Sequence, residues 1–385
     1  MGLWHFVTAG ESHGPGLVGI VEGVPSQVPL TAELINQDLA RRQKGYGRGG
    51  RMAIEKDQVE FFGGVRHGKT LGSPVALLVK NRDFVNWQES MAPGPGKPDR
   101  IVTRPRPGHA DLVGGVKYAH RDLRNVLERA SARETTMRVA LGAVARSFLH
   151  ELGIEVRGHV LSIGDVHAPY RDYTLDDILA ADNSAVRVVD PDTEKGMTEA
   201  IDRAKENGDT LGGIFEIKAF GLPVGLGSYV QWYRRIEGQL AQALLSIPAM
   251  KAVEVGTGMA QADIPGSQVH DAIWWDKERG FSRLTNRAGG IEGGITTGMP
   301  LAVRVAMKPL STLLSPLGSF DIESKEPFLA QVERSDVTAV PPAVVVGEAM
   351  VMHVLADAIV EKFGGDSLPE IVERIRLWER YVREY

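Results

Sequence analysis

Hydrophobic positions along the chain predict strands and helices in the same order twice. In the first part, short apolar runs predict strands before Gly10 and at 17–21, 59–65 and 75–80. Leu34, Ile35 and Leu39 share one helical face, and Thr31 before them is a typical N-cap residue. The Pro- and Gly-rich stretch 81–107 predicts a surface loop.

The most regular helical pattern follows residue 130. Its apolar face recurs with a 3.6-residue period at Met137, Leu141, Val144, Ala145, Phe148 and Leu152. Gly153 ends the pattern, and Ser131 with Glu134 has the spacing of a capping box. A helix that begins there would place Arg129 and Arg133 at its positive end, which favours an anion-binding site.

The pattern repeats after residue 154. Apolar runs predict strands at 154–160, 214–220, 252–257 and 301–307, and helices near 194–207, 236–246 and 343–363. A last helix begins after Ser367, which has capping-box spacing with Glu370. Because no linker separates the two sets, we expect a single α+β domain, 1–385, with two similar halves, about 1–153 and 154–385.

Composition then narrows the class of protein. Lys and Arg number 44 against 49 Asp and Glu, and this net charge of −5 argues against a nucleic-acid partner. The chain has no cysteine, which excludes disulfides and thiolate metal sites, and no histidine pair has zinc-ligand spacing, so we expect no metal. No apolar run approaches the ~18 residues of a membrane span, and no secretory signal is recognisable. We therefore expect a cytoplasmic protein with no membrane partner.

Two Gly-rich segments carry the candidate chemistry. Gly10-Glu11-Ser12-His13-Gly14 places a hydroxyl beside an imidazole, and Arg106-Pro107-Gly108-His109-Ala110-Asp111 holds a second histidine. Glycine lets a ligand approach the backbone, and histidine exchanges protons near neutral pH. The first segment also matches the G-x-S-x-G nucleophile elbow, so a serine hydrolase that uses Ser12 stays open as an alternative.

Arginines accompany both segments. The basic stretch 41–51 is compatible with a phosphate clamp, with an exposed basic face, or with an RNA-binding loop. Further arginines lie beside glycines, prolines or the predicted helix start: Arg104, Arg106, Arg129, Arg133 and Arg334. One polyanionic small molecule would explain them all, because guanidinium groups bind phosphate and carboxylate bidentately.

Four motifs, in this order, resemble the chorismate synthase family: 10–14, 45–48 (Gly-Tyr-Gly-Arg), 106–111 and 129–135. The later segments 286–294, 308–312, 334–336 and 363–367 agree, so the resemblance spans nearly the whole chain. It implies a lyase of the shikimate pathway, in aromatic amino acid biosynthesis, that converts 5-enolpyruvylshikimate 3-phosphate to chorismate and phosphate by 1,4-elimination. It also implies a β/α/α/β layered sandwich, with antiparallel sheets outside central helices, and a homotetramer.

The resemblance implies reduced FMN as cofactor, with NADPH as a candidate reductant. It assigns the catalytic roles to three residues. His109 would protonate the leaving phosphate, His13 would stabilise or protonate the reduced flavin, and Asp336 would take a proton from flavin N5. The implied substrate-binding residues are Ser12, Arg42, Arg48, Arg106, Arg133 and Arg334.

The implied FMN-binding residues are Arg42, Arg48, Arg129, Ala130, Ser131, Pro248, Ala249, Gly293, Lys308, Pro309, Leu310, Ser311, Thr312 and Arg334. Pro248 stands where other family members often have a polar amide. A side-chain hydrogen bond is therefore not expected at this position, whereas a backbone contact is.

Overall fold

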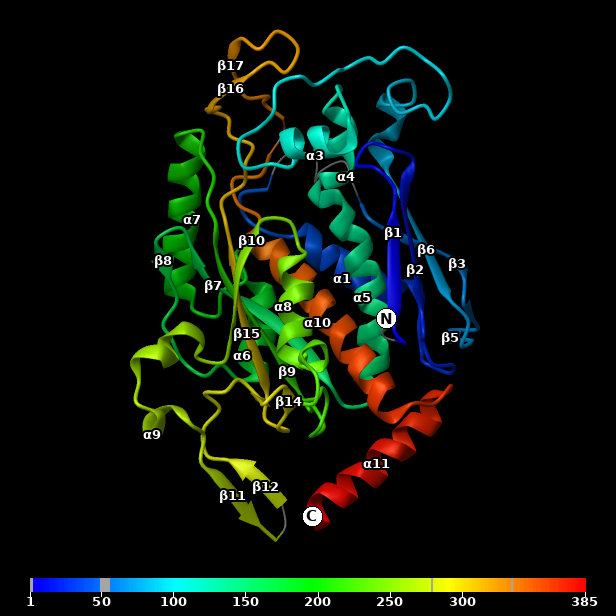
Figure 1. Ribbon diagram of the computed structural model, residues 1–385, viewed down its shortest axis with the longest axis vertical. Helices are drawn as coiled ribbons and strands as arrows, with labels where there is room; N and C mark the ends of the chain where they lie inside the picture. Colours follow the sequence, from blue (N-terminus) through cyan, green and yellow to red (C-terminus); the bar gives the residue numbers. More distant parts are fainter. Residues whose placement is uncertain (1–2, 49–55, 278–279, 334) are drawn as a thin grey trace.

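Two antiparallel sheets with helices between them form the body of the protein (Figure 1). The structure is a computed structural model that describes residues 3–48, 56–277, 280–333 and 335–385. An α+β fold with antiparallel sheets, as expected from the hydrophobic pattern, is confirmed.

The first sheet contains the strands predicted in the first part of the chain. Its spatial order is β1 (His5–Ala9), β2 (Gly16–Glu22), β6 (Val75–Lys80) and β3 (Val59–Gly63). Helices α1 (Ala32–Gln43) and α5 (Thr135–His150) pack on this sheet. Thr31 caps α1 by accepting a hydrogen bond from Leu34 N, as predicted.

The second sheet comes from the rest of the chain. Its order is β10 (Met250–Val255), β15 (Leu301–Met307), β9 (Gly213–Phe220), β7 (Glu155–Ile163) and β8 (Val166–His167). Helices α8 (Ile236–Leu245) and α10 (Val340–Phe363) pack on it, and α10 also lies against α5 and α1. One continuous hydrophobic core results, with members from both sheets and all four helices.

Helix α10 is long and apolar enough to cross a membrane by length and composition, with a mean hydropathy of 1.9 in its most apolar window. The expectation that no apolar run approaches that length is therefore wrong. Because 89% of that window is buried inside the molecule, α10 is a core helix of this fold.

Smaller elements surround this body. The helices are α3 (Asp111–Tyr118), α4 (Arg124–Ala130), α6 (Leu175–Ala180), α7 (Pro191–Glu206), α9 (Gly266–Val269) and α11 (Leu368–Glu384). Short hairpins pair β4 (Val65–Arg66) with β5 (Lys69–Thr70), β11 (Ile273–Asp276) with β12 (Gly280–Arg283), β13 (Ile291–Glu292) with β14 (Ile295–Thr296), and β16 (Gly318–Phe320) with β17 (Pro327–Leu329). Short 3-10 helices are η1 (Arg82–Asn86), η2 (Ala132–Glu134), η3 (Ala181–Asn183), η4 (Trp232–Arg234) and η5 (Gly258–Asp263). The hydrophobic pattern predicted α7 and α11 but neither α3 nor α4.

Neither predicted capping box forms. Ser131 accepts a hydrogen bond from Arg133 N in η2, while the Glu134 carboxylate turns to Arg138, with 2.9 Å between Arg138 Nε and Glu134 Oε1. Helix α5 therefore begins at Thr135, and Arg129 lies in the last turn of α4 rather than at a helix N-terminus.

At the second site, Ser367 makes no side-chain cap. Glu370 instead accepts a hydrogen bond from Asp366 N at 3.1 Å and pairs with Arg374. In both places a nearby arginine, four residues further along the helix, provides a stronger partner for the glutamate than the cap would.

The stretch 81–107 is a surface loop only in its middle. Its ends are buried, with Asn81 5% exposed and Arg106 7% exposed. Both residues belong to the polar site described next.

Candidate active site

The loop 10–14 joins β1 to β2 and is held by hydrogen bonds from elsewhere in the chain. Gly10 has φ +108°, and a Cβ on it would lie 2.3 Å from Gly16 O, so the turn requires glycine. Asn81 Nδ2 donates to backbone oxygens of Glu11, Ser12 and Gly14 at 3.1, 3.3 and 2.8 Å. Asn81 was not among the expected site residues, because its partners lie about 70 positions away in sequence.

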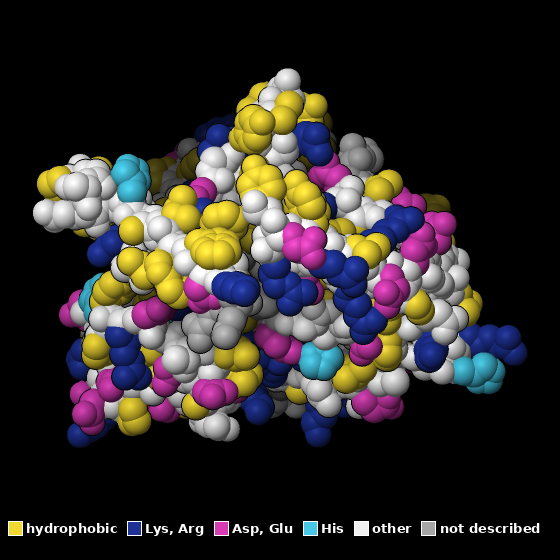
Figure 2. All heavy atoms as spheres, turned by 90° about the horizontal axis from the view of Figure 1, so that it is seen from below, with side chains coloured by type: hydrophobic (Ala, Val, Ile, Leu, Met, Phe, Trp, Pro, Cys, Tyr) yellow, Lys and Arg dark blue, Asp and Glu magenta, His cyan; other side chains and the backbone are white. Residues whose placement is uncertain are grey.

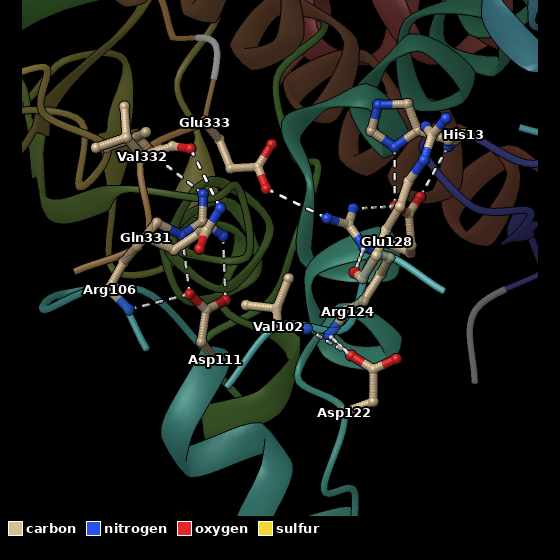
Figure 3. A network of polar contacts seen from close by, with 12 residues as sticks. His13, Val102, Arg106, Asp111, Asp122, Arg124, Glu128, Gln331, Val332 and Glu333 are labelled. Carbon is tan, nitrogen blue, oxygen red and sulfur yellow. Dashed lines mark hydrogen bonds and ion pairs between the residues drawn. The ribbon is translucent and has the colours of Figure 1, made fainter. Parts of the chain in front are cut away.

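His13 is fixed on two sides. Its Nδ1 lies 2.8 Å from Glu128 Oε1, and its backbone N donates to Glu128 Oε2 at 2.8 Å (Figure 3). The Trp87 ring stacks on the imidazole with 3.9 Å between ring centroids. Burial alone would raise the pKa of Glu128, but the hydrogen bonds and charge of His13 and the charge of Arg124 lower it below its usual value. Glu128 is therefore ionised at neutral pH.

His109 lies in a second cluster around Asp111, the first residue of α3. His109 Nδ1 is 2.5 Å from Asp111 Oδ1, and Arg106 Nε donates to Asp111 Oδ2 at 2.8 Å. Arg106 Nη1 also donates to Thr312 Oγ1 at 2.8 Å. Burial opposes ionisation of Asp111, but hydrogen bonds from His109 and Arg106 hold its pKa well below its usual range.

In Figure 3, Gln331 and Val332 lie on the side of Arg106, and Glu333 points from there towards Arg124. Glu333 Oε1 is 3.4 Å from Arg124 Nη2, and Gln331 N donates to Arg104 O at 3.4 Å. Segments that are more than 200 residues apart thus surround one polar region.

Three of the expected arginines form a further cluster at the end of α1. Arg42 donates to Thr135 Oγ1 at 2.9 Å and to Ala132 O at 2.8 Å. Arg133 Nη1 donates to Asp57 Oδ1 at 2.6 Å, and Arg133 Nε to Asn81 Oδ1 at 2.9 Å. Asn81 thus connects Arg133 to the loop that holds His13.

Arg48 completes this cluster through Asp336, with 3.3 Å between Arg48 Nε and Asp336 Oδ2. Burial lowers the pKa of Arg48, and it lowers the pKa of Arg42 to about 9 despite the nearby Asp57. Arg42 Nη1 is buried, has no hydrogen bond among the described residues, and lies 3.9 Å from Asp57 Oδ2. In the described part of the chain, three guanidinium groups thus share two carboxylates, which suits an anion-binding site.

The segment 308–312 reaches the His109 loop. Lys308 Nζ donates to Gly108 O at 2.9 Å, and Ser311 Oγ donates to the same oxygen at 3.2 Å. Burial, and to a smaller extent Lys251, lower the pKa of Lys308. Ala249, with φ +72°, accepts a hydrogen bond from Lys308 N at 3.0 Å and so lies beside this segment.

Other expected cofactor residues are not brought together here. Gly293 lies in the β13–β14 turn, next to Gly294, whose carbonyl contacts Ile236 at the start of α8. Ala249 follows the other end of α8, about 15 Å along that helix. Arg129 donates to Gly10 O and Thr8 O, and Arg334 lies outside the described residues.

Comparison with known proteins identifies the family to which this chain belongs. The family model described as chorismate synthase matches residues 4–360. The chain belongs to the chorismate synthase family. Its relatives include the chorismate synthase of Geobacillus thermodenitrificans (strain NG80-2), which is 58% identical over 386 residues. That of Moorella thermoacetica (strain ATCC 39073 / JCM 9320) is 57% identical over 383 residues, and each alignment covers 99% of this chain and 100% of the relative.

A solved structure described as a crystal structure of chorismate synthase agrees in fold. It superposes with a TM-score of 0.82 at 43% identity and covers 99% of both chains. The chain is therefore a lyase with chorismate synthase activity in the shikimate pathway, and its family uses reduced FMN. The serine hydrolase and RNA-binding interpretations therefore lose their support.

Proposed function

We propose that the cluster of Arg42, Arg48 and Arg133 binds anionic groups of 5-enolpyruvylshikimate 3-phosphate. Arg42 is the observation that carries this proposal, because its Nη1 is buried without a hydrogen bond among the described residues. A phosphate or carboxylate would supply the acceptor and offset the cost of burying the charge. Ser12 and Arg106 would contact the same substrate from the neighbouring loops, as would Arg334, which lies outside the described residues.

His109 is then the general acid for the leaving phosphate. Asp111 accepts a hydrogen bond from its Nδ1, and Arg106, paired to the same carboxylate, adds positive charge where the phosphate departs. His13 would protonate or stabilise the reduced cofactor when it is bound, and Asp336, held by Arg48, would accept the proton released in the elimination. These six side chains come from four separate segments of the chain.

The residues around 308–312 fit FMN. An ammonium group (Lys308) and the hydroxyls of Ser311 and Thr312 are the donors that a phosphate monoester requires. Arg42 and Arg48 belong to the same expected set of FMN-binding residues. Pro309, Leu310, Pro248 and Ala249 would contribute backbone and apolar contacts. Ala130, Ser131 and Arg129 would do so from the end of α4, and Gly293 and Arg334 complete the expected set. When bound, reduced FMN supplies the transient electron donation that this elimination needs.

Replacement of His109 tests the assignment. We expect His109→Ala to lose about 10²–10⁴-fold in kcat in an anaerobic assay with chemically reduced FMN, while FMN binding measured by flavin fluorescence is retained. His150→Ala is the control, because His150 is exposed and pairs only with Glu155 among the described residues. Full activity of His109→Ala would remove this histidine from the mechanism.

A homotetramer is also part of the proposal. Figure 2 views the end of the molecule that carries β11, β12 and α11, and hydrophobic side chains gather there between charged groups. The exposed apolar residues of these elements include Ile273, Trp274, Trp275, Phe281 and Tyr381. Sedimentation equilibrium should give four times the 41.8 kDa chain mass, and a monomer at micromolar concentration would refute it.

We infer further that the fold is a β/α/α/β sandwich of two similar halves, about 1–153 and 154–385. The spatial order β1-β2-β6-β3 places the first, second, fourth and third strands of the first half side by side, and β7-β9-β15-β10 repeats this order in the second half. Along the sequence of each half, one helix (α1 or α8) comes between the second and the third of these strands. Another helix (α5 or α10) comes after the fourth strand. An internal duplication explains this match.

NADPH remains a proposed reductant, and a cytoplasmic location remains a prediction. An anaerobic assay that compares NADPH with dithionite separates the two sources of reduced FMN. Turnover with NADPH alone would support reduction of the flavin by the enzyme itself, and turnover with dithionite alone would exclude it.

A further inference from the structure

Both histidines contact a carboxylate through the same ring nitrogen. Nδ1 of His13 lies 2.8 Å from Glu128 Oε1, and Nδ1 of His109 lies 2.5 Å from Asp111 Oδ1. The two carboxylates are buried, with Glu128 3% exposed and Asp111 fully covered. The two pairs differ in their separation along the sequence: Asp111 is two residues from His109, whereas Glu128 is 115 residues from His13.

Each carboxylate is also paired with an arginine. Arg124 Nη1 lies 3.3 Å from Glu128 Oε1, one helical turn away on α4. Arg106 donates to both oxygens of Asp111, through Nε at 2.8 Å and Nη2 at 3.1 Å. The site therefore contains two arrangements in which a carboxylate binds both a histidine and an arginine, on different elements. Figure 3 shows the Glu128 arrangement in full and the Arg106–Asp111 pair of the other.

The direction of the histidine hydrogen bonds follows from the charge of the carboxylates. The pKa values of Glu128 and Asp111 lie below their usual values, since pairing outweighs burial in both. An ionised carboxylate only accepts hydrogen bonds, so the imidazole Nδ1 must donate. A neutral ring with its proton on Nδ1 has its lone pair on Nε2, which is then the nitrogen that gains and loses a proton.

We propose that Glu128 and Asp111 are positioning residues that fix the tautomer and orientation of His13 and His109, so that both exchange protons through Nε2. This inference rests on the proposed roles of the two histidines. Arg124 and Arg106 keep the carboxylates ionised when the imidazoles are neutral, and so preserve the tautomer through the reaction cycle.

Further charged groups near His13 are Arg100, Arg124 and Glu11. Trp87 covers one face, and Arg100 lies on the Trp87 ring at 4.1 Å from its centroid. Arg124 lies 5.2 Å from the same centroid, and Glu11 belongs to the same loop as His13. Glu128 is in direct contact with this imidazole, 2.8 Å from its Nδ1.

Around His109, the charged groups given by contacts of the described residues are Asp111, Arg106 and Lys308. Arg106 Nη2 lies 3.1 Å from His109 Nδ1 and 3.4 Å from Nε2, and Lys308 Nζ reaches Gly108 O in the same loop. Both cations disfavour a protonated imidazole, and Asp111 favours it. Loss of the Asp111 charge should therefore change the pH dependence of the activity.

The test uses the neutral, isosteric replacements Glu128→Gln and Asp111→Asn in the full-length enzyme. We expect kcat to fall at least about tenfold in each, with KM changed less than kcat. At high pH, kcat/KM falls as a required imidazolium loses its proton. This high-pH limb should move to lower pH by about one unit or more in both variants, because the imidazolium loses a neighbouring negative charge. Unchanged kcat and an unmoved limb would overturn the proposal.

A matched control exists outside the site. Glu216 is buried, lies 3.3 Å from His159 Nε2 and pairs with Arg304 at 3.0 Å, so it has the same two partner types, a histidine and an arginine, on the second sheet. Glu216→Gln should lower the melting temperature without moving the pH limb. If Glu216→Gln shifted the limb as Glu128→Gln does, the effect would be one of stability and the proposal would fail.

A double-mutant cycle separates a positioning role from an independent one. If Glu128 acts through His13, Glu128→Gln should add no loss of kcat to His13→Ala. Additive losses would overturn the proposal. If Glu128→Gln does not fold, Glu128→Asp replaces it, because this change keeps the negative charge but shortens the side chain. In Glu128→Asp, kcat should fall while the high-pH limb stays in place. An unchanged kcat would contradict the positioning role.

The outcomes also distinguish this inference from the proposed function. Full activity of both His13→Ala and His109→Ala would refute the histidine roles themselves. Loss of activity in these variants, with normal kcat and pH profile in Glu128→Gln and Asp111→Asn, would refute only the positioning roles.

Discussion

Asp111 forms hydrogen bonds with two residues of one short segment, Arg106 and His109, and they determine its charge. Burial favours the protonated acid, whereas His109 and the two donors of Arg106 favour the carboxylate. The lowered pKa means that pairing prevails, so the folded state binds its proton less tightly than the unfolded chain does. A group of this kind stabilises the fold above its unfolded pKa and loses that contribution as the pH falls through its folded pKa.

We therefore expect Asp111→Asn to lower the free energy of unfolding by about 3 kcal/mol at neutral pH, because Arg106 loses its buried counter-charge. The difference from the parent should shrink as the pH falls below about 4, where the unfolded parent chain takes up the proton. Urea unfolding between pH 7 and pH 3 measures this difference.

Glu373→Gln is the control for that experiment. Glu373 and Arg376 are both about two-thirds exposed, at 65% and 67%, so the change should cost less than about 0.5 kcal/mol at any pH. A difference for Asp111→Asn that stays constant down to pH 3 would show that pairing does not hold this carboxylate ionised.

At the scale of elements, the close packing of α5 against α10 depends on one glycine. A Cβ on Gly142 would lie 2.4 Å from Ala349 Cβ, closer than two carbon atoms can approach. Both helices are buried between the sheets, so neither can move aside without disturbing the core. A helical glycine here therefore serves packing, although glycine lowers helix propensity.

This contact predicts opposite effects for the same substitution at two helical glycines. Gly142→Ala should destabilise by about 1–3 kcal/mol through overpacking, although alanine favours the helix by roughly 1 kcal/mol. Gly238→Ala in α8 should be neutral or stabilise by up to about 1 kcal/mol, because the nearest atom to its Cβ, Trp232 O, is 4.0 Å away. Thermal melting of both variants, at equal protein concentration, measures the difference, and a stabilised Gly142→Ala would show that α5 and α10 can separate at no cost.

At the scale of the whole molecule, the two proposed halves share one core. Helix α10 from the second half packs on α5 and α1 from the first, and Arg41 of α1 forms an ion pair with the buried Glu348 of α10, at 2.6 Å. A half on its own would expose the apolar side of α5 or of α10 and leave one buried charge without its partner. The halves are therefore related in topology but dependent in stability.

We expect fragments 1–153 and 154–385 to be unfolded when each is expressed alone, and to form a folded complex when they are co-expressed. Circular dichroism and urea unfolding of each fragment test this expectation. As a control, a flexible insertion at 94–96, where the loop is exposed, should leave the melting temperature of the intact chain unchanged. Cooperative unfolding of either fragment alone would show two independent domains.

Much of the fold followed from the sequence because it depends on local patterns. The apolar stripe from Met137 to Leu152 predicted α5, and the repeated order of strands and helices predicted an α+β fold. The glycine-flanked histidines and the arginines near them indicated an anion-binding site, because those residue types bind phosphate wherever they lie. The resemblance to chorismate synthases, confirmed by the family match, rested on such short motifs.

Only the tertiary structure decided which side chains meet. The carboxylate that pairs with His13, the amide that holds loop 10–14, and the aspartate that binds Arg133 come from distant segments: Glu128, Asn81 and Asp57. The two capping boxes failed for the same reason, since Glu134 and Glu370 had arginine partners in the folded helices. Periodicity specifies which face of an element is buried, but a buried polar group takes the partner that the packing of distant segments brings within hydrogen-bond distance.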